Sequence, residues 1–461
     1  MLKTVVLADD LTGANGTGVL LRKIGLKVCT LLDPVQGITS TLAEFDAVSF
    51  STGSRALAPD DAYARVQAVA EQFRPYPVRR YAKRIDSTLR GNLGAETDAL
   101  LDTLGDRFMA FVVPCFPSAN RIHIGGYLLV SGVPLHRTDA ADDPKNPVRT
   151  SRPSALFAKQ SRYPVATVGL DDLLEDEPDL LEKLQVYRDA GIRTVVFDAV
   201  SEADIEQIAH LAVVSGIPFV AVDPGPFTAA VTAADEAVNV TAIASNEASP
   251  LTTHSADIPT DQPADPGSAS TTRPQILLAI GSVCGVARRQ LEILKARQDL
   301  LMVTIQIGEL VKGEPERCAE VIRVRNEIVA QCHKFQICCN VGCGIDPDQR
   351  VDFSSAAACC GLSEDALSER VNASIGEMVD LILTADCQFN ALYTSGGDIT
   401  IAVCLQLGAI GMRLIGEVLP LAAFGTLMQG RYDGMKMITK GGLAGNDDSL
   451  AVCVNYLLSK T

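Results

Sequence analysis

The chain has 461 residues, of which 47% are hydrophobic and 21% are charged, so it is long enough for two cores and lacks the composition of a disordered protein. Its formal net charge of −16 argues against a surface that binds nucleic acid or an anionic membrane. The same charge still permits a locally basic pocket for a small anion.

No targeting or membrane-spanning segment is evident. The first apolar run, residues 5–8, is short and ends in two aspartates, so we expect no signal peptide. No run approaches the roughly 18 apolar residues of a transmembrane helix. The 13 cysteines are an odd number, which without an export signal predicts reduced thiols. We expect a cytoplasmic protein with no nucleic-acid or membrane partner, and the sequence is compatible with a homodimer.

The chain begins with a strand–helix–strand pattern. Residues 4–8 predict a strand, residues 14–24 have helical spacing that ends at Gly25, and residues 27–32 predict a second strand. The alternation continues with strands predicted at 47–50, 81–85, 111–113, 194–197 and 218–222, and helices at 59–72, 93–104 and 202–214. Such alternation is typical of an α/β domain with a largely parallel sheet.

Residues 246–274 interrupt this alternation with five prolines among Ser, Thr and Asp, which predicts a linker or a long loop. A new α/β series follows, with strands predicted at 275–280, 300–307, 335–341, 390–394 and 435–439 and a long helix at 364–384. We therefore predict two α/β domains with mostly parallel sheets, residues 1–245 and 275–461, that face each other across a cleft.

Ligands of open α/β sheets bind beyond the carboxyl ends of the strands. In the N-terminal half the segments around these ends are rich in long basic side chains, namely Arg55, Arg79, Arg80, Lys83, Arg84, Arg90 and Arg121. They fit a solvated strand edge with scattered salt bridges, or a site that binds a carboxylate or phosphate through guanidinium forks. The neighbouring DST and GN sequences (86–88 and 91–92) favour a site for a polyhydroxylated anion.

The corresponding loops of the C-terminal half are rich in glycine, and each opens a predicted helix. Backbone amides at such turns and the helix dipole favour phosphate. The three turns contain Gly281 and Ser282, Gly396 and Gly397, and Gly441 and Gly442, with Lys440, Asp398, Asp447 and Asp448 beside them. Together they predict a nucleotide–Mg²⁺ site, because carboxylates hold magnesium through one or two ligands and water.

Several familiar alternatives do not fit. The chain has no GxxxxGK[ST] segment, and no GxGxxG follows a strand, so neither a P-loop nor a dinucleotide fold is supported. A haloacid-dehalogenase phosphatase needs two aspartates separated by one residue, whereas Asp9 and Asp10 are adjacent and point to opposite sides in an extended chain. The cysteines at 332–360 include no CxxC pair, so buried thiols are favoured over a zinc site.

The order of these motifs resembles the four-carbon acid sugar kinase family over nearly the whole chain. The resemblance rests on ADDLTGA (8–14), TGSR (52–55), KRIDSTLRGN (83–92), PCFPSANR (114–121), SGGD (395–398) and TKGGLAGNDD (439–448). It implies an N-terminal domain that binds the acid sugar and a C-terminal domain that binds ATP. It also implies transfer of the γ-phosphoryl group to the terminal hydroxyl of a tetronate.

Matched motif by motif, the resemblance also implies site residues. The substrate pocket would be lined by Asp9, Asp10, Arg55, Lys83, Arg84, Asp86 and Arg90. ATP would be bound by Ser282, Gly396, Gly397, Asp398, Lys440, Gly441 and Gly442. Asp10 and Asp86 are both candidates for the base that orients or deprotonates the attacking hydroxyl, and Asp447 or Asp448 would serve Mg²⁺.

The family divides by substrate. KRIDSTLRGN is similar to the threonate and erythronate kinases and differs from the 3-oxo-tetronate enzymes, so we expect D-threonate, converted to 4-phospho-D-threonate, with D-erythronate as the alternative. The chain departs from the family in the long 246–274 segment and in Asn15–Gly16, where the family usually has Asn-Asp. A non-catalytic cytosolic sugar-acid-binding protein would also need a basic cleft, but three turns that favour phosphate would serve no purpose in such a protein.

Overall fold

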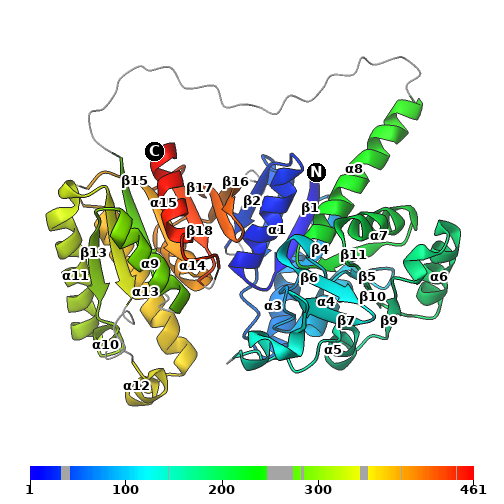
Figure 1. The fold of residues 1–461 in the computed structure, drawn as a ribbon, viewed down its shortest axis with the longest axis horizontal. Helices are drawn as coiled ribbons and strands as arrows, with labels where there is room; N and C mark the ends of the chain where they lie inside the picture. The colour runs from blue at the N-terminus through cyan, green and yellow to red at the C-terminus, as the bar shows by residue number, and fades with distance from the viewer. Residues whose placement is uncertain are drawn as a thin grey trace.

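The computed structural model describes residues 1–32, 42–143, 145–246, 274–281, 285–342, 351–385, 387–442 and 444–461. Ser282 and most of the predicted 246–274 segment lie outside these residues. Two α/β halves lie side by side (Figure 1). The predicted fold class, two α/β domains with mostly parallel sheets, is confirmed.

The N-terminal half is built on a parallel sheet with the strand order β2-β3-β1-β4-β11-β5-β10-β9. Nearly all residues of its central strands are buried, because helices cover both faces and apolar runs are therefore favoured. The strands are β1 (Leu2–Ala8), β2 (Val28–Leu31), β3 (Ala47–Ser51), β4 (Val78–Arg84), β5 (Met109–Val112), β9 (Val165–Val168), β10 (Thr194–Phe197) and β11 (Phe219–Asp223).

Helices pack on both faces of this sheet through their buried apolar side chains. One face is covered by α1 (Leu11–Lys23), α6 (Glu177–Asp189), α7 (Glu202–Val214) and α8 (Pro226–Asn246). The other face is covered by α3 (Pro59–Phe73), α4 (Leu93–Leu104) and α5 (Pro153–Gln160).

The C-terminal half has the strand order β13-β14-β12-β15-β18-β17-β16. The pairs from β13 to β18 are parallel, and β17 pairs antiparallel with both β18 and β16. The strands are β12 (Gln275–Ile280), β13 (Leu301–Ile305), β14 (Ile337–Gly342), β15 (Phe389–Ser395), β16 (Gly411–Leu419), β17 (Ala422–Met428) and β18 (Lys436–Lys440).

Helices again cover both faces of the C-terminal sheet. One face carries α10 (Ile307–Leu310), α11 (Glu314–Gln331), α12 (Phe353–Cys360), α13 (Glu364–Leu383) and α14 (Gly397–Gln406). The other carries α9 (Gly285–Arg297) and α15 (Ser449–Lys460).

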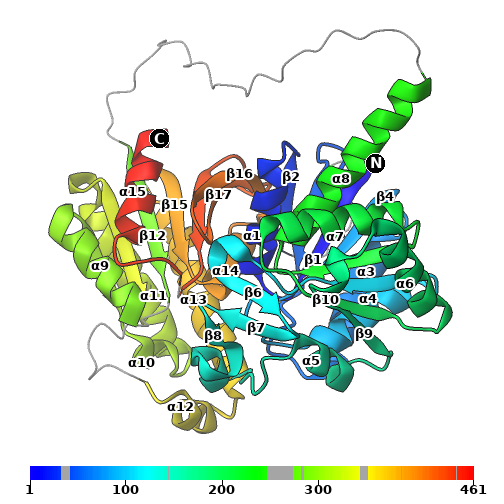
Figure 2. The ribbon, with the colours of Figure 1, turned by 45° about the vertical axis from the view of Figure 1, so that its right-hand side comes forward.

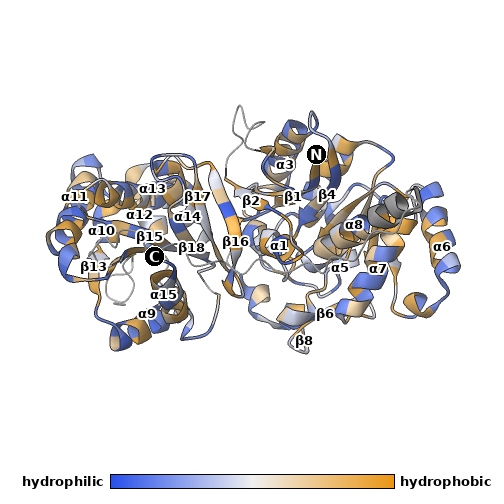
Figure 3. Ribbon diagram, turned by 90° about the horizontal axis from the view of Figure 1, so that it is seen from above, coloured by the Kyte–Doolittle hydropathy of each residue, from blue (hydrophilic) through white to orange (hydrophobic). Residues whose placement is uncertain are grey.

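The two sheets are joined edge to edge, which the sequence did not predict. β2 pairs antiparallel with β16, Leu31 opposite Gly411 and Val28 opposite Leu414, so that one sheet of 15 strands runs through both halves. Seen from above, β16 lies beside β2 and α1 at the junction (Figure 3). One hydrophobic cluster contains residues of both halves, so the halves share a core as well as main-chain hydrogen bonds.

A separate antiparallel sheet is formed by β6 (Arg121–Ile124), β7 (Tyr127–Val130) and β8 (Val133–Pro134), and it stands apart from the main sheet (Figure 2). His123 anchors it, since its Nδ1 lies 2.9 Å from the carbonyl oxygen of Phe197 and 3.1 Å from Asp198 Oδ1. Burial lowers the pKa of His123, with Asp198 opposing the shift. His123 therefore has a structural explanation.

The cysteines differ from the expectation at one pair. Cys332 and Cys387 form a disulfide that ties the end of α11 to the segment before β15, so the prediction that all thiols are reduced is wrong there. Cys338 and Cys339 are buried thiols of β14, and burial raises the pKa of Cys338 to about 12. Within the described residues, no helix combines the length and apolar composition needed to span a membrane.

Candidate functional site

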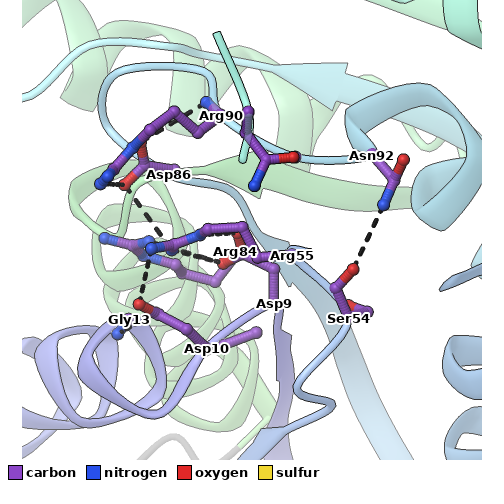
Figure 4. A network of polar contacts seen from close by, with 12 residues as sticks. Asp9, Asp10, Gly13, Ser54, Arg55, Arg84, Asp86, Arg90 and Asn92 are labelled. Carbon is purple, nitrogen blue, oxygen red and sulfur yellow. Dashed lines mark hydrogen bonds and ion pairs between the residues drawn. The ribbon is translucent and has the colours of Figure 1, made fainter. Parts of the chain in front are cut away.

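The carboxyl ends of β3, β1 and β4 lie next to one another, because these strands are parallel neighbours. Asp9 and Asp10 follow β1, Arg55 follows β3, and Lys83 and Arg84 end β4. Register places Ala8 opposite both Ser51 and Arg84. Segments that are far apart in the sequence therefore meet at one edge of the sheet (Figure 4).

Arg55 is the hub of this cluster. Its Nε and Nη2 lie 2.7 and 3.1 Å from the two oxygens of Asp9, and its Nη1 lies 2.7 Å from Asp10 Oδ2. Nη2 also lies 3.6 Å from Asp86 Oδ1. Burial opposes its charge, but the three aspartates hold the pKa of Arg55 well above its usual range. One guanidinium thus fixes three carboxylates.

Asp10 also begins helix α1. Its backbone is extended, and its Oδ1 accepts a 2.6 Å hydrogen bond from the amide of Gly13, which caps the helix. Burial raises the pKa of Asp10, and the charges of Asp9 and Asp86 add to the increase against the pull of Arg55. Although Asp9 and Asp10 are adjacent, the fork of Arg55 reaches both.

Asp86 lies in the loop after β4 and is held by arginines. Arg90 donates to its two oxygens at 2.8 and 3.1 Å, and Arg90 also pairs with Asp143 at 3.1 Å. Burial would raise the pKa of Asp86, but Arg55 and Arg90 hold it well below its usual range. Gly91, at φ +96°, allows the loop after β4 to approach Arg55 closely, since a Cβ there would lie 3.3 Å from Cγ of Arg55.

Arg84 is a buried cation without a close partner. Its side chain is 6% exposed, and the nearest paired carboxylate oxygen, Oδ1 of Asp9, is 3.8 Å away. Among the described residues its Nε and Nη1 find no hydrogen-bond acceptor. A Cβ on Gly13 would lie 2.6 Å from Nη1, so the glycine allows the guanidinium to approach the first turn of α1.

Lys83 lies beside this cluster, and its charge helps to lower the pKa of Asp9. It is fully buried, its ammonium lies 2.7 Å from Glu96 Oε2 in α4, and it donates a 2.8 Å hydrogen bond to the carbonyl of Arg84. Through this hydrogen bond Lys83 helps to fix the backbone at Arg84. Sequence reasoning did not single out Glu96, although an acidic residue on the apolar face of a helix is a signal for a buried ion pair.

The other basic residues around β4 and β6 fall into two groups, one outside the cluster and one near it. Arg79 and Arg80 lie at the start of β4 and bind Asp235 of α8, so they are not part of the cluster. Arg121, at the start of β6, is near the cluster, since Asp86 stabilises its charge while burial lowers its pKa. Asn92, part of the GN pair singled out in the sequence, donates to the carbonyls of Ser54 and Leu57 and so holds the loop that carries Arg55.

Two of the glycine turns meet in the C-terminal half. β15 and β18 are parallel neighbours with Ser395 opposite Lys440, and the amide of Gly396 donates to the carbonyl of Lys440 at 2.9 Å. The buried ammonium of Lys440 bonds to the carbonyls of Gly441 and Ala444 at 3.0 and 2.8 Å, and so shapes the Gly441–Gly442 turn. Asp398 is exposed in the first turn of α14.

Asp447 and Asp448 lie just before α15, and their ion pairs are with α9 and not with the two glycine turns. Asp447 is 3.0 Å from Arg289 Nε, and Asp448 is 2.7 Å from Arg297 Nη2, both on α9. No group of three or more His, Cys, Asp or Glu able to hold a metal ion occurs among the residues that the structure describes. For either aspartate to hold Mg²⁺ with both oxygens, its arginine pair would have to open.

The two halves of the site adjoin across the domain junction. A small pocket there is lined by Thr12, Asn15 and Gly16 of α1 and by Thr439 and Gly441 at β18. The first turn of α1, which carries Asp10, thus lies against the glycine turns of the other half. The domain junction therefore brings the cluster of arginines and aspartates close to the glycine turns that are expected to bind phosphate.

Comparison with known proteins agrees with this division. A model of a sugar-binding N-terminal domain matches residues 4–231, and a model of a nucleotide-binding C-terminal domain matches residues 277–450. The D-erythronate kinase of Heliobacterium modesticaldum is 38% identical over 100% of this chain and 98% of that protein. The D-threonate kinase of Salmonella typhimurium is 30% identical over 99% of this chain and 98% of that protein.

The fold is also shared with a solved structure. A Haemophilus influenzae protein of the DUF1537 family superposes with a TM-score of 0.67 at 20% identity, covering 98% of this chain and 99% of that chain. The motif order of the sequence, the paired half-sites and the full-length relatives point the same way. The chain belongs to the four-carbon acid sugar kinase family, and it is an ATP-dependent kinase of that family.

Proposed function

We propose that the chain transfers the γ-phosphoryl group of ATP to the terminal hydroxyl of a four-carbon sugar acid, with the acid bound by residues 1–245 and ATP by residues 275–461. The observation that carries this proposal is Arg84, a buried guanidinium whose Nε and Nη1 have no acceptor among the described residues. Leaving such groups unsatisfied is costly, so a ligand with acceptor oxygens would complete the site. The carboxylate of a sugar acid supplies two such acceptors.

The aspartates suit the hydroxyls of the same ligand. Ionised carboxylates are acceptors only, and hydroxyl groups of a sugar acid are donors. Asp9 and Asp86 are kept ionised by Arg55, which holds the pKa of both below the usual range against the effect of burial. Arg55, Arg84 and Arg90 would then bind the charged end of the acid, while Asp9 and Asp86 orient its hydroxyls.

Asp10 is the better candidate for the base. A carboxylate whose pKa is raised takes a proton more readily than one whose pKa is lowered, and burial raises that of Asp10. Asp86 is a weaker base because Arg55 and Arg90 lower its pKa. Asp10 also lies in the turn that adjoins the other domain, where the terminal hydroxyl must meet ATP.

The nucleotide side would be formed by the Gly396–Gly397–Asp398 turn and by Lys440, Gly441 and Gly442. The N-terminus of α14 presents amides and a partial positive charge to phosphate oxygens. Of the nearby carboxylates, Asp398 is exposed and has no ion pair within the described residues, whereas Asp447 and Asp448 are engaged by arginines. Asp398 therefore fits Mg²⁺ best, an ion that would neutralise charge on the β- and γ-phosphates.

D-erythronate is the substrate that we propose, with D-threonate as the alternative. KRIDSTLRGN does not separate these two acids, which differ only in configuration at C2. The D-erythronate kinase is 38% identical to this chain, and the D-threonate kinase is 30% identical. That difference in identity favours the erythronate reaction over the threonate reaction expected from the sequence.

The test is an assay of the purified full chain with ATP, Mg²⁺ and a panel of D-erythronate, D-threonate, L-threonate and 3-oxo-tetronate. ADP release is followed by a coupled assay, and the position of the phosphate is read by ³¹P NMR. We expect D-erythronate to have the highest kcat/KM and to become phosphorylated at C4. A higher kcat/KM for D-threonate would overturn the substrate assignment, and no stimulation by any acid would overturn the proposed reaction.

Arg84→Gln tests the residue on which the proposal rests. Charge-assisted hydrogen bonds contribute about 1.5–3 kcal/mol, so the KM for the acid should rise by about 10- to 100-fold while the KM for ATP stays within about twofold. Arg65→Gln, an exposed position on α3, makes the same charge change and should alter neither constant. An unchanged KM for the acid in Arg84→Gln would remove Arg84 from the acid site.

A further inference from the structure

Thr12 lies between the two glycine turns of the other domain, and neither its position nor its chemistry is used by the proposed function, on which this inference rests. A Cβ on Gly441 would lie 3.2 Å from Cγ2 of Thr12 and 3.6 Å from its Oγ1. A Cβ on Gly397 would lie 3.8 Å from the same Oγ1. One hydroxyl therefore adjoins both turns that would hold the phosphates of ATP.

Two helix N-termini also meet at this point. Thr12 is in the first turn of α1, and Gly397 is the first residue of α14. A Cβ on Gly397 would lie 3.8 Å from Cβ of Leu11, the first residue of α1. Each N-terminus carries partial positive charge, so an anion placed between the two is favoured. Asp10 caps α1 through the amide of Gly13, and Asp398, in the first turn of α14, is the carboxylate proposed for Mg²⁺.

Two buried polar side chains beside this turn also lack partners among the described residues, and one of them, Arg84, is assigned to the acid by the proposed function. Arg84 Nη1 would lie 2.6 Å from a Cβ on Gly13, so the guanidinium is aimed at the first turn of α1. Its Nε and Nη1 have no acceptor among the described residues, and only 5% of the residue is exposed. Asn15, 4% exposed, lines the interdomain pocket with Thr12, and its Oδ1 also has no partner there. The junction is polar and incompletely satisfied.

From this geometry we infer that Thr12 binds the γ-phosphoryl group during its transfer, donating a hydrogen bond from Oγ1 to a non-bridging phosphoryl oxygen. The terminal oxygen of the acid forms the new bond to phosphorus while the bond to the β,γ-bridging oxygen breaks. ADP leaves with that electron pair, and the hydroxyl proton passes to Asp10. Thr12 keeps its own proton, and its contribution is to stabilise charge and to orient the group.

The methyl group of Thr12 suggests the opposing explanation, in which the residue only packs against Gly441. Two substitutions separate the explanations, because each removes one half of the side chain. Thr12→Val keeps the Cγ2 contact and loses the hydroxyl, whereas Thr12→Ser keeps the hydroxyl and loses the methyl group. Thr12→Ala replaces Thr12→Val as the hydroxyl-free variant if the latter does not fold, which is checked by thermal unfolding.

Loss of one preorganised donor to a transition-state oxyanion typically lowers kcat by about 100- to 1,000-fold. We expect Thr12→Val to show a fall of about 100-fold in kcat with the KM for the acid within about threefold. Thr12→Ser should retain at least about one third of the wild-type kcat. The opposite order, an active valine variant and an impaired serine variant, would show that Thr12 acts by packing and would overturn the inference, as would wild-type kcat in both.

Nucleotide binding gives a second readout that does not depend on turnover. By calorimetry, Thr12→Val should bind ADP within about twofold of wild type and should bind the non-hydrolysable ATP analogue AMPPNP at least about fivefold more weakly. Equal affinities of wild type and Thr12→Val for AMPPNP would overturn the contact with the γ-phosphate. If the wild-type chain binds AMPPNP but phosphorylates no acid, the proposed function fails while the Thr12 contact is still decided by this comparison.

Discussion

At the scale of single residues, we expect Lys83 to act through its buried ion pair with Glu96 and not by contacting the acid. Both side chains are 1% exposed, and their charged groups lie 2.7 Å apart. Lys83→Met should lower the free energy of unfolding by about 3–5 kcal/mol, because it leaves Glu96 buried without its partner. Lys3→Met, which removes a half-exposed pair with Glu236, should cost at most about 1 kcal/mol. Urea unfolding measures both.

The deficit of Lys83→Met should also depend on pH. Burial raises the pKa of Glu96, and a carboxyl whose folded pKa is above its unfolded value favours the folded state at low pH and loses that effect as pH rises through the folded pKa. The difference in stability between the variant and the wild type should therefore shrink as pH falls. A normally folded variant with a raised KM for the acid would instead indicate that Lys83 contacts substrate.

Asp10 gives a kinetic prediction at the same scale. Its pKa is raised above the ordinary value of 3.8, so the acid limb of the kcat/KM profile should lie above that value, where activity is lost as pH falls and the carboxylate is protonated. Asp10→Asn keeps an N-cap for α1 but removes the base, so kcat should fall by about 100- to 10,000-fold. If Asp86→Asn instead abolishes the limb and Asp10→Asn retains it, Asp86 is the base.

At the scale of elements, the sequence predicted well what depends on local pattern. The strand predicted at 275–280 is β12, and the helix predicted at 93–104 is α4, because apolar runs and helical periodicity are local signals. The β16–β17 hairpin was missed, since its edge position depends on pairing with β2, a partner about 380 residues away. The same limit applies to Lys83 and Arg84. Their motif is recognisable in the sequence, but the direction in which each side chain points depends on the packing of α4 and α1.

The glycine turn after β18 is the element on which the nucleotide assignment is most easily tested. A Cβ on Gly441 would lie 3.2 Å from Thr12 and 3.5 Å from Ala444, so a valine there must displace one side of the turn. Gly441→Val should raise the KM for ATP by about tenfold, a value in line with a loss of about 1.4 kcal/mol, and leave the KM for the acid nearly unchanged. Gly308→Ala, where a Cβ meets nothing within 4 Å, is the control.

At the scale of the whole molecule, the continuous sheet sets how the two half-sites face each other. The base, Thr12 and the phosphate turns come from different halves, so their alignment depends on the β2–β16 pairing and on the shared core. Phosphoryl transfer is sensitive to such alignment, since its catalysis is mostly positioning. A change that separates these strands should therefore reduce kcat more than it reduces the affinity for either substrate.

Gly411→Val is the change that tests this arrangement. A Cβ on Gly411 would lie 2.1 Å from the carbonyl oxygen of Thr30 and 3.1 Å from Cα of Leu31, so the two edge strands cannot keep their distance. We expect kcat to fall by about 100-fold with ADP affinity within about threefold, and small-angle scattering to report a larger radius of gyration. Gly416→Ala in the same strand, where a Cβ meets nothing within 4 Å, should match wild type. Wild-type kcat in Gly411→Val would mean that the joined sheet does not align the half-sites.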